Sequence, residues 1–153
     1  LIARRLRDAK VVVAGSTYED WRSVFNKEPP QNMYLIGGGF SDRVLPRLYK
    51  GARLVVIPIT NRSISNRLLE ALFYGRPIVT SEIARFIHPE LIHKEHVYIS
   101  NWDNIVDDIV KLAKNDETLE TLEAGARSAY NRWFSTKLNA TVASKLVRSL
   151  IEQ

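Results

Sequence analysis

Three polar side chains within residues 66–70 could form a binding site. Asn66, Arg67 and Glu70 follow an apolar run at residues 54–57, and Glu70 stands four positions after Asn66. If the segment is a helix, Asn66 and Glu70 share one face and Arg67 lies beside them. Helical side chains lean toward the N-terminus, so Glu70 is directed back toward the preceding loop. The free amides of a first helical turn and a nearby arginine bind phosphate, so these residues predict an anion site.

The residues around this trio indicate a strand, a loop, a short helix and a second strand. Ser63 or Ser65 can cap the helix, because a serine hydroxyl accepts a hydrogen bond from a first-turn amide. Gly75 ends the helix and Pro77 prevents it from continuing. In an open parallel sheet, ligands bind at the carboxyl ends of the strands, where loops lead into helices. The same spacing is also typical of an amphipathic crossover helix with a solvated Glu–Arg pair, and both interpretations stay open here.

Strand and helix patterns alternate along the chain. The expected strands lie near residues 10–15, 33–37, 53–58, 77–80 and 97–100. The expected helices lie near residues 1–8, 18–26, 41–50, 65–74, 83–93 (interrupted at Pro89), 102–114, 116–131 (capped by Asp116) and 136–152. Most of the strands are short apolar runs, which is typical of strands buried on both faces. The alternation predicts an α/β fold with one doubly wound parallel sheet flanked by helices, and Glu70 at its carboxyl edge, accessible to solvent.

Composition fits a single domain over residues 1–153. Apolar residues make up 45% of the chain and charged residues 25%, as in ordinary globular proteins. No cysteine is present, which excludes disulfides and thiol metal sites and permits a reducing compartment. No apolar run approaches the ~20 residues that span a bilayer, and no secretory signal is recognisable. The formal net charge of +5 suits a nucleoside diphosphate, a nucleic acid or an acidic membrane surface without choosing among them.

A glycine-rich turn follows the second expected strand. Gly37-Gly38-Gly39-Phe40-Ser41-Asp42 lies between a strand and a helix, as a phosphate-binding loop would. It lacks the third glycine and the acidic residue of a dinucleotide site. A tight turn capped by Ser41 is therefore the favoured interpretation.

Other clusters point to no further chemistry. The histidines His88, His93 and His96 lie near Glu90 and Glu95, but Pro89 breaks helical spacing and no pair has the spacing of a zinc helix. No metal is therefore expected. The arginines and lysines are scattered rather than interleaved with aromatic residues, so nucleic acid is not the expected partner.

The resemblance to a known family rests on the same helix. Leu69-Glu70-Ala71-Leu72, followed by Gly75-Arg76-Pro77-Ile78-Val79, resembles the donor-binding segment of retaining glycosyltransferase family four, the group 1 glycosyl transferases. These enzymes have two Rossmann-like domains, the glycosyltransferase-B fold. The matching stretches also include 11–15, 33–37, 41–49 and 133–135, so the resemblance covers nearly the whole chain.

The resemblance implies a hexosyltransferase of glycan biosynthesis that moves a sugar from a nucleoside diphosphate sugar to an acceptor hydroxyl, without a cofactor. Glu70 is expected to hold the ribose hydroxyls, while the amides of Ser65 and Asn66 together with Arg67 stabilise the departing diphosphate. The implied donor-binding residues are Gly37, Gly38, Pro58, Arg62, Ser65, Asn66, Arg67 and Glu70. No residue is assigned as catalytic.

The sequence departs from the family at one glutamate. The family's paired glutamates are eight positions apart, but the partner position of Glu70 holds Arg62, and Ser63-Ile64-Ser65 replaces a Gly-Phe-Gly turn. The loop is similar to a branch with the pattern Gly-Ile-Lys-Asn-Lys-Val-Leu-Glu. The residue that contacts the sugar is therefore missing, which leaves open the sugar and whether transfer retains configuration. A non-catalytic nucleotide- or anion-binding domain, in which Arg62 holds another anion, is the alternative function.

Family domains open with a strand that ends in Gly-Arg and is followed by a Lys-Gly turn, and neither feature precedes Leu1. We therefore expect a fragment of a longer two-domain enzyme that lacks its first strand and is inactive alone. A gap should then separate the strands near residues 11–15 and 54–58. Alternatively, Arg62 and Arg67 supply the missing positive charge. The acceptor site is expected on the missing N-terminal domain, through which peripheral membrane contact stays open, and the expected location is cytoplasmic.

Overall fold

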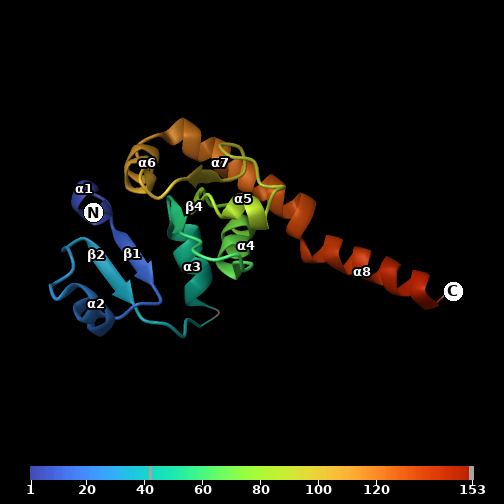
Figure 1. The fold of residues 1–153 in the computed structure, drawn as a ribbon, viewed down its shortest axis with the longest axis horizontal. Helices are drawn as coiled ribbons and strands as arrows, with labels where there is room; N and C mark the ends of the chain where they lie inside the picture. The colour runs from blue at the N-terminus through green and yellow to red at the C-terminus, as the bar shows by residue number, and fades with distance from the viewer. Residues whose placement is uncertain (42, 152–153) are drawn as a thin grey trace.

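A computed structural model describes residues 1–41 and 43–151 (Figure 1). The elements run in the order α1 (Ile2–Arg5), β1 (Val11–Ala14), α2 (Tyr18–Phe25), β2 (Met33–Ile36), α3 (Val44–Gly51), β3 (Val55–Ile57), α4 (Asn66–Phe73), β4 (Ile78–Ser81), α5 (Ala84–Ile87), β5 (Tyr98–Ser100), α6 (Ile105–Leu112), α7 (Asp116–Ala129), the π-helix η1 (Tyr130–Phe134) and α8 (Thr136–Ile151). The predicted alternation of strand and helix is confirmed. Asp42 and Glu152, which the predicted turn and last helix include, lie outside the described residues.

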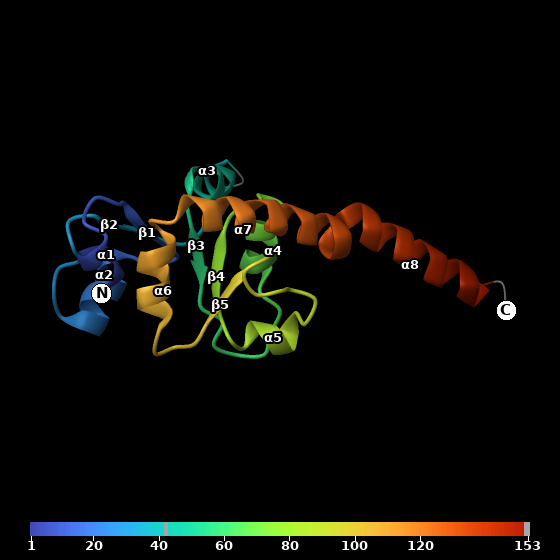
Figure 2. The same cartoon turned by 90° about the horizontal axis from the view of Figure 1, so that it is seen from above.

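The strands form two parallel sheets rather than one. β1 pairs with β2, while β3, β4 and β5 form a separate sheet in that order (Figure 2). The parallel pairing was predicted correctly, but the single continuous sheet was wrong, because β1 and β3 are not hydrogen-bonded to each other. An apolar run predicts a strand, but it does not predict which other strand pairs with it. The split lies where the family resemblance predicts a gap.

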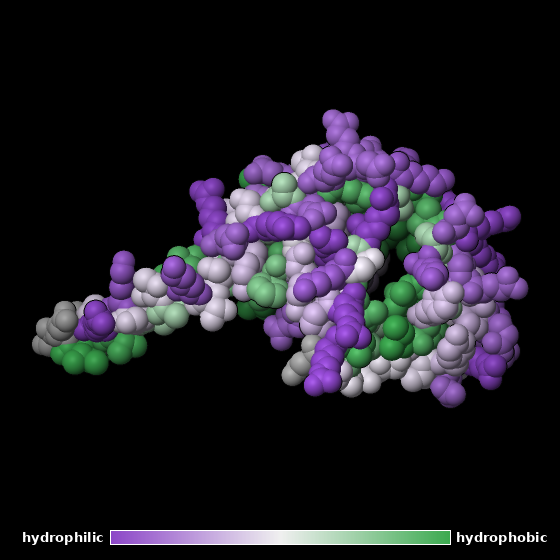
Figure 3. Space-filling view, turned by 180° about the vertical axis from the view of Figure 1, so that it is seen from behind, coloured by the Kyte–Doolittle hydropathy of each residue, from purple (hydrophilic) through white to green (hydrophobic). Residues whose placement is uncertain are grey.

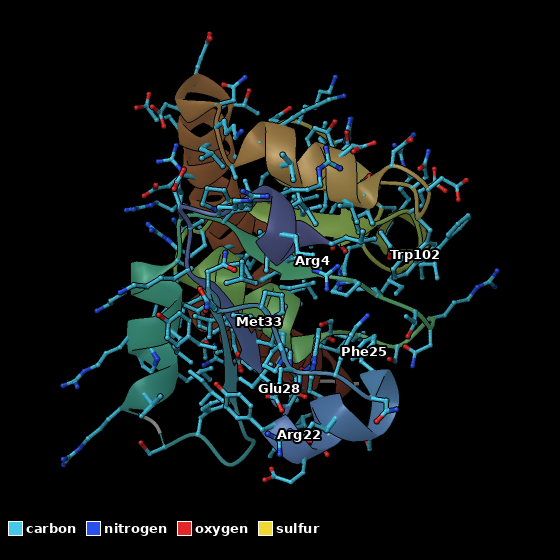
Figure 4. All side chains as sticks on the ribbon, turned by 90° about the vertical axis from the view of Figure 1, so that its left-hand side faces the viewer. Arg4, Arg22, Phe25, Glu28, Met33 and Trp102 are labelled. Carbon is cyan, nitrogen blue, oxygen red and sulfur yellow. The ribbon has the colours of Figure 1, made fainter. Side chains whose placement is uncertain are left out.

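The β1–β2 layer is less buried than its apolar sequence predicts. Val12 is 47% exposed, Tyr34 45% and Val56 of β3 37%, whereas β4 is buried along its whole length. The prediction that the strands are buried on both faces therefore holds for β4 and is wrong for β1, β2 and β3. In Figure 3, the half of the molecule away from α8 has a hollow with apolar walls. In the view of Figure 4, Met33 of β2 lies between Arg4 of α1 and Arg22 of α2.

Helices cover both faces of the β3–β4–β5 sheet. Ile78 of β4 belongs to a core cluster with Leu68 and Leu72 of α4, and neighbouring Val79 belongs to a second cluster with Ile109 of α6. Consecutive strand residues face opposite sides, so α4 and α6 lie on opposite faces. α7 contributes to both clusters, and α8 projects away from this body (Figure 1).

Several helix ends differ from the sequence prediction. Asn115, not Asp116, caps α7: its side chain accepts a hydrogen bond from the Thr118 amide. The helix expected at residues 83–93 is only α5, because Pro89 lacks the amide needed to continue it. α3 begins after Arg43, and Ser41 contributes its carbonyl to the Val44 amide (2.9 Å) rather than acting as the predicted side-chain cap.

Candidate functional site

α4 begins and ends much as its sequence predicts. Ser65 occupies the N-cap position with an extended backbone, but its side chain makes no capping hydrogen bond, so the predicted cap is wrong in that detail. Gly75 adopts φ 60° and ends the helix: its amide donates to Leu72 and that of Arg76 to Ala71, both at 2.9 Å. These two bonds form a Schellman motif. The glycine thus fixes how α4 leads into β4.

The first turn of α4 leaves backbone donors available. The Ser65 carbonyl accepts from the amides of Leu68 (3.0 Å) and Leu69 (3.3 Å). The amides of Asn66 and Arg67 donate no hydrogen bond to any described residue. Free first-turn amides carry the positive end of the helix dipole. This end of α4 therefore has the free donors that the predicted anion site requires.

Arg67 reaches across the split between the two sheets. Its Nη2 lies 3.8 Å from where a Cβ would stand on Gly15, which follows β1 and has φ +91°. The Gly15 amide donates to the carbonyl of Ile36 (2.8 Å), so the ends of β1 and β2 are joined there. Gly37 follows at once, and a Cβ on it would lie 3.2 Å from Thr17 Cγ2. An exposed guanidinium thus stands at the carboxyl end of β1.

Glu70 is partly accessible to solvent and also has a partner within the protein. It is half-buried, and its Oε2 accepts a hydrogen bond of 2.9 Å from the hydroxyl of Tyr49 on α3. Burial raises the pKa of Tyr49 above its usual value, and the hydrogen bond and the charge of Glu70 raise it further. Tyr49 was missed by the sequence interpretation. The available signal was a tyrosine on the apolar stripe of α3, because a buried tyrosine hydroxyl needs a partner.

The side chain of Arg62 contacts a residue outside this group. Its guanidinium stands over the ring of Phe86, 5.6 Å from the ring centroid, beside α5. Pro58 opens the exposed loop between β3 and α4, and Gly38 faces open space after β2. The structure therefore gathers Ser65, Asn66, Arg67 and Glu70 on α4, with Gly37, Gly38 and Pro58 at strand ends and Arg62 turned toward Phe86.

Two hollows lie away from α4. One of about 440 Å³ is lined by residues that include Tyr98, Asp108 and Lys111, and one of about 500 Å³ by residues of α1 and β2 that include Arg4 and Tyr34. The residues of the group on α4 line neither of these two hollows.

The three histidines make separate contacts. His88 pairs with Glu90 (3.2 Å) and His96 with Glu95 (3.1 Å), while His93 Nδ1 accepts from the Ile99 amide (2.9 Å). In the part of the chain that the structure describes, no three histidine or acidic side chains gather as a metal site would require. None of the described helices is both long and apolar enough to cross a membrane.

Parallel strands with helices on both faces define a Rossmann-like α/β domain. The family model described as glycosyl transferases group 1 matches residues 1–115. The chain belongs to this family, so the family predicted by resemblance is confirmed, and the match includes the whole of α4. No curated protein matches the chain closely enough to count as a relative.

Proposed function

We propose that this chain is the donor-binding domain of a glycosyltransferase, which moves a sugar from a nucleoside diphosphate sugar to an acceptor hydroxyl. The observation that carries the proposal is the start of α4. There, two unpaired amides, the exposed Arg67 guanidinium and the Glu70 carboxylate lie within five residues of one helix. Family membership supplies the reaction class, and this arrangement supplies the groups that a nucleoside diphosphate needs.

Each group has a separate role. The amides of Asn66 and Arg67 and the guanidinium of Arg67 bind the diphosphate and stabilise the charge that develops on it as the sugar departs. Glu70 accepts a hydrogen bond from a ribose hydroxyl. Gly37, Gly38 and Pro58 border the donor with backbone and ring atoms at the strand ends. No cofactor or metal takes part.

The position of Arg62 argues against its proposed part in phosphate binding. Its guanidinium stands over the ring of Phe86, which engages the charge in another contact. With Arg67 as the cation at the start of α4, we expect this chain to bind donor weakly by itself and not to transfer sugar. A further domain carries the acceptor site and, with it, any contact with a membrane surface. We propose that the protein is cytoplasmic and functions in glycan biosynthesis.

Titration calorimetry of the full-length protein with UDP, GDP and the matching nucleosides tests this proposal. Glu70→Gln should weaken binding by about 1.5–3 kcal/mol, roughly ten- to a hundredfold, because a charged acceptor to a hydroxyl is lost. Arg67→Ala should weaken diphosphate binding but leave nucleoside binding nearly unchanged. Arg62→Ala is the matched control and should change neither. If Glu70→Gln binds each active donor as tightly as the parent, Glu70 is only a solvated surface residue.

A non-catalytic nucleotide- or anion-binding domain is the second candidate. It is favoured by the arginine at position 62, where the family has the glutamate that contacts the sugar. Product analysis separates the two functions. Nucleotide binding without sugar transfer by the full-length protein, with any donor that binds, would support the second.

A further inference from the structure

A tyrosine hydroxyl on α3 touches the candidate site from outside α4. Tyr49 donates to Glu70 Oε2 at 2.9 Å, and the same hydroxyl lies 3.3 Å from the carbonyl oxygen of Arg67. A hydroxyl has one proton to donate, and the nearer, charged carboxylate oxygen is the stronger acceptor. One atom of α3 therefore lies beside both the Arg67 backbone and the Glu70 carboxylate.

The hydroxyl is held in place by its own surroundings. Tyr49 is only 8% exposed and belongs to the main hydrophobic cluster of the molecule. Its ring stacks on that of Tyr74, with 5.2 Å between ring centroids and 16° between the planes. A ring packed in this way has one rotamer available, so its hydroxyl is a fixed donor.

Glu70, by contrast, has a long side chain with several rotatable bonds. Its Oε2 is engaged by Tyr49, while its Oε1 accepts no hydrogen bond from a described residue. Holding Oε2 limits the rotation of the carboxylate and therefore the positions that Oε1 can take. An acceptor that is already oriented binds a ligand hydroxyl without first losing rotamer freedom.

We infer that Tyr49 is a positioning residue that orients the Glu70 carboxylate toward a ribose hydroxyl of the bound nucleotide. The inference rests on the proposed function of Glu70 as the ribose acceptor. Tyr49 touches no ligand; it acts by fixing Oε2 so that Oε1 faces the hydroxyl. Its effect should therefore depend on the presence of ribose hydroxyls in the ligand.

Tyr49→Phe in the full-length protein tests the inference, with UDP, GDP and their 2′,3′-dideoxy counterparts as probes in titration calorimetry. The substitution keeps the ring and removes only the hydroxyl. Affinity for whichever ribonucleotide binds should fall roughly tenfold, while affinity for its dideoxy counterpart stays the same. In a Glu70→Gln background, Tyr49→Phe should have no further effect, because the two residues act as one unit.

Tyr74→Phe is the matched control. It removes a hydroxyl from the partner ring in the same stack, and that hydroxyl makes no hydrogen bond within the described residues. It should leave the affinities for the ribonucleotide and for its dideoxy counterpart unchanged. The double variant Glu70→Gln/Tyr49→Phe keeps the test decisive if Tyr49→Phe alone lowers stability, because a merely structural loss would then add to that of Glu70→Gln.

The results separate the positioning role of Tyr49 from the proposed ribose-binding role of Glu70. If Glu70→Gln weakens ribonucleotide binding but Tyr49→Phe does not, or if Tyr49→Phe weakens ribo and dideoxy ligands equally, Tyr49 is only a packing contact between α3 and α4. In that case the proposed role of Glu70 stands. If the parent protein binds ribo and dideoxy ligands equally and Glu70→Gln changes nothing, the proposed function of Glu70 fails, and the positioning role fails with it.

Discussion

Gly125 on α7 is the position where one added methyl group should harm this fold most. A Cβ there would lie 1.8 Å from the carbonyl oxygen of Glu95 and 2.7 Å from its carbon, whereas ordinary contact begins at 3.4 Å. These are backbone atoms, so no side chain can turn away. For Gly125→Ala, α7 would have to retreat by roughly 1.5 Å from residues 95 and 96.

The retreat would open the core that α7 closes. Leu122 and Ala126, on either side of Gly125, are 0% exposed and belong to the two core clusters. Overpacking of this kind costs about 1–3 kcal/mol, and more against backbone, while alanine regains about 1 kcal/mol of helix propensity. At the upper end of that cost the net loss should be about 2 kcal/mol, which lowers Tm by roughly 4–8 °C for a chain of this length.

Thermal unfolding followed by circular dichroism measures this loss. Gly51→Ala is the matched control, because Gly51 ends α3 with no atom within 4 Å of its added Cβ. It should leave Tm unchanged or raise it slightly, since alanine reduces the entropy of the unfolded chain. An equal Tm for Gly125→Ala and Gly51→Ala would refute the close approach of α7 to residues 95 and 96.

Two further predictions concern the N-terminal segment and pH. The side-chain nitrogen of Asn32 lies 2.9 Å from each of the carbonyl oxygens of Ala3, Leu6 and Ala9, and its two N–H groups are shared among these three acceptors. Asn32→Ala should cost about 1–3 kcal/mol in urea unfolding and speed trypsin cleavage within residues 4–7, and unchanged cleavage would contradict this attachment. The pKa of Tyr49 is raised in the folded state, so above about pH 10 the unfolded chain releases the tyrosine proton first. The contribution of Tyr49 to the free energy of unfolding should therefore be fully present below that pH and be lost as pH rises further. Tyr49→Phe should make the fall in unfolding free energy with pH less steep in urea titrations. An equally steep fall would exclude Tyr49 as the cause.

Local features of the fold could be predicted from the sequence, whereas the pairing of distant segments could not be predicted from their residue patterns. Gly75 shows why predictions of local features succeed. The end of the helix needs a residue with positive φ, and glycine adopts that conformation readily. The number and direction of the strands could be predicted from their apolar runs in the same way. The apolar runs alone do not predict the split between β1 and β3, because a run of three or four residues is compatible with many neighbours, and the gap there was predicted only from the family resemblance.

In the candidate site, too, local features were predicted and long-range contacts were not. Spacing alone placed Asn66, Arg67 and Glu70 on one helix, and the structure keeps them there. The hydrogen bond from Tyr49 to Glu70 joins residues 21 positions apart on two helices, and no local pattern encodes it. The contact of Arg62 with the ring of Phe86 is likewise not encoded by a local pattern.

The split between the sheets bears directly on how this site works. Arg67 belongs to α4, which packs on β3 and β4, yet its guanidinium lies beside Gly15 at the end of β1. A phosphate held by Arg67 would therefore contact both layers, and its binding geometry depends on their relative position. Because β1 and β3 share no hydrogen bond, that position is only loosely specified by the backbone. A further strand between them, which the family resemblance implies, would set the distance from Gly15 to Arg67 before the ligand arrives. We therefore expect nucleotide to bind more tightly where such a strand is present, because Arg67 is then preorganised against β1.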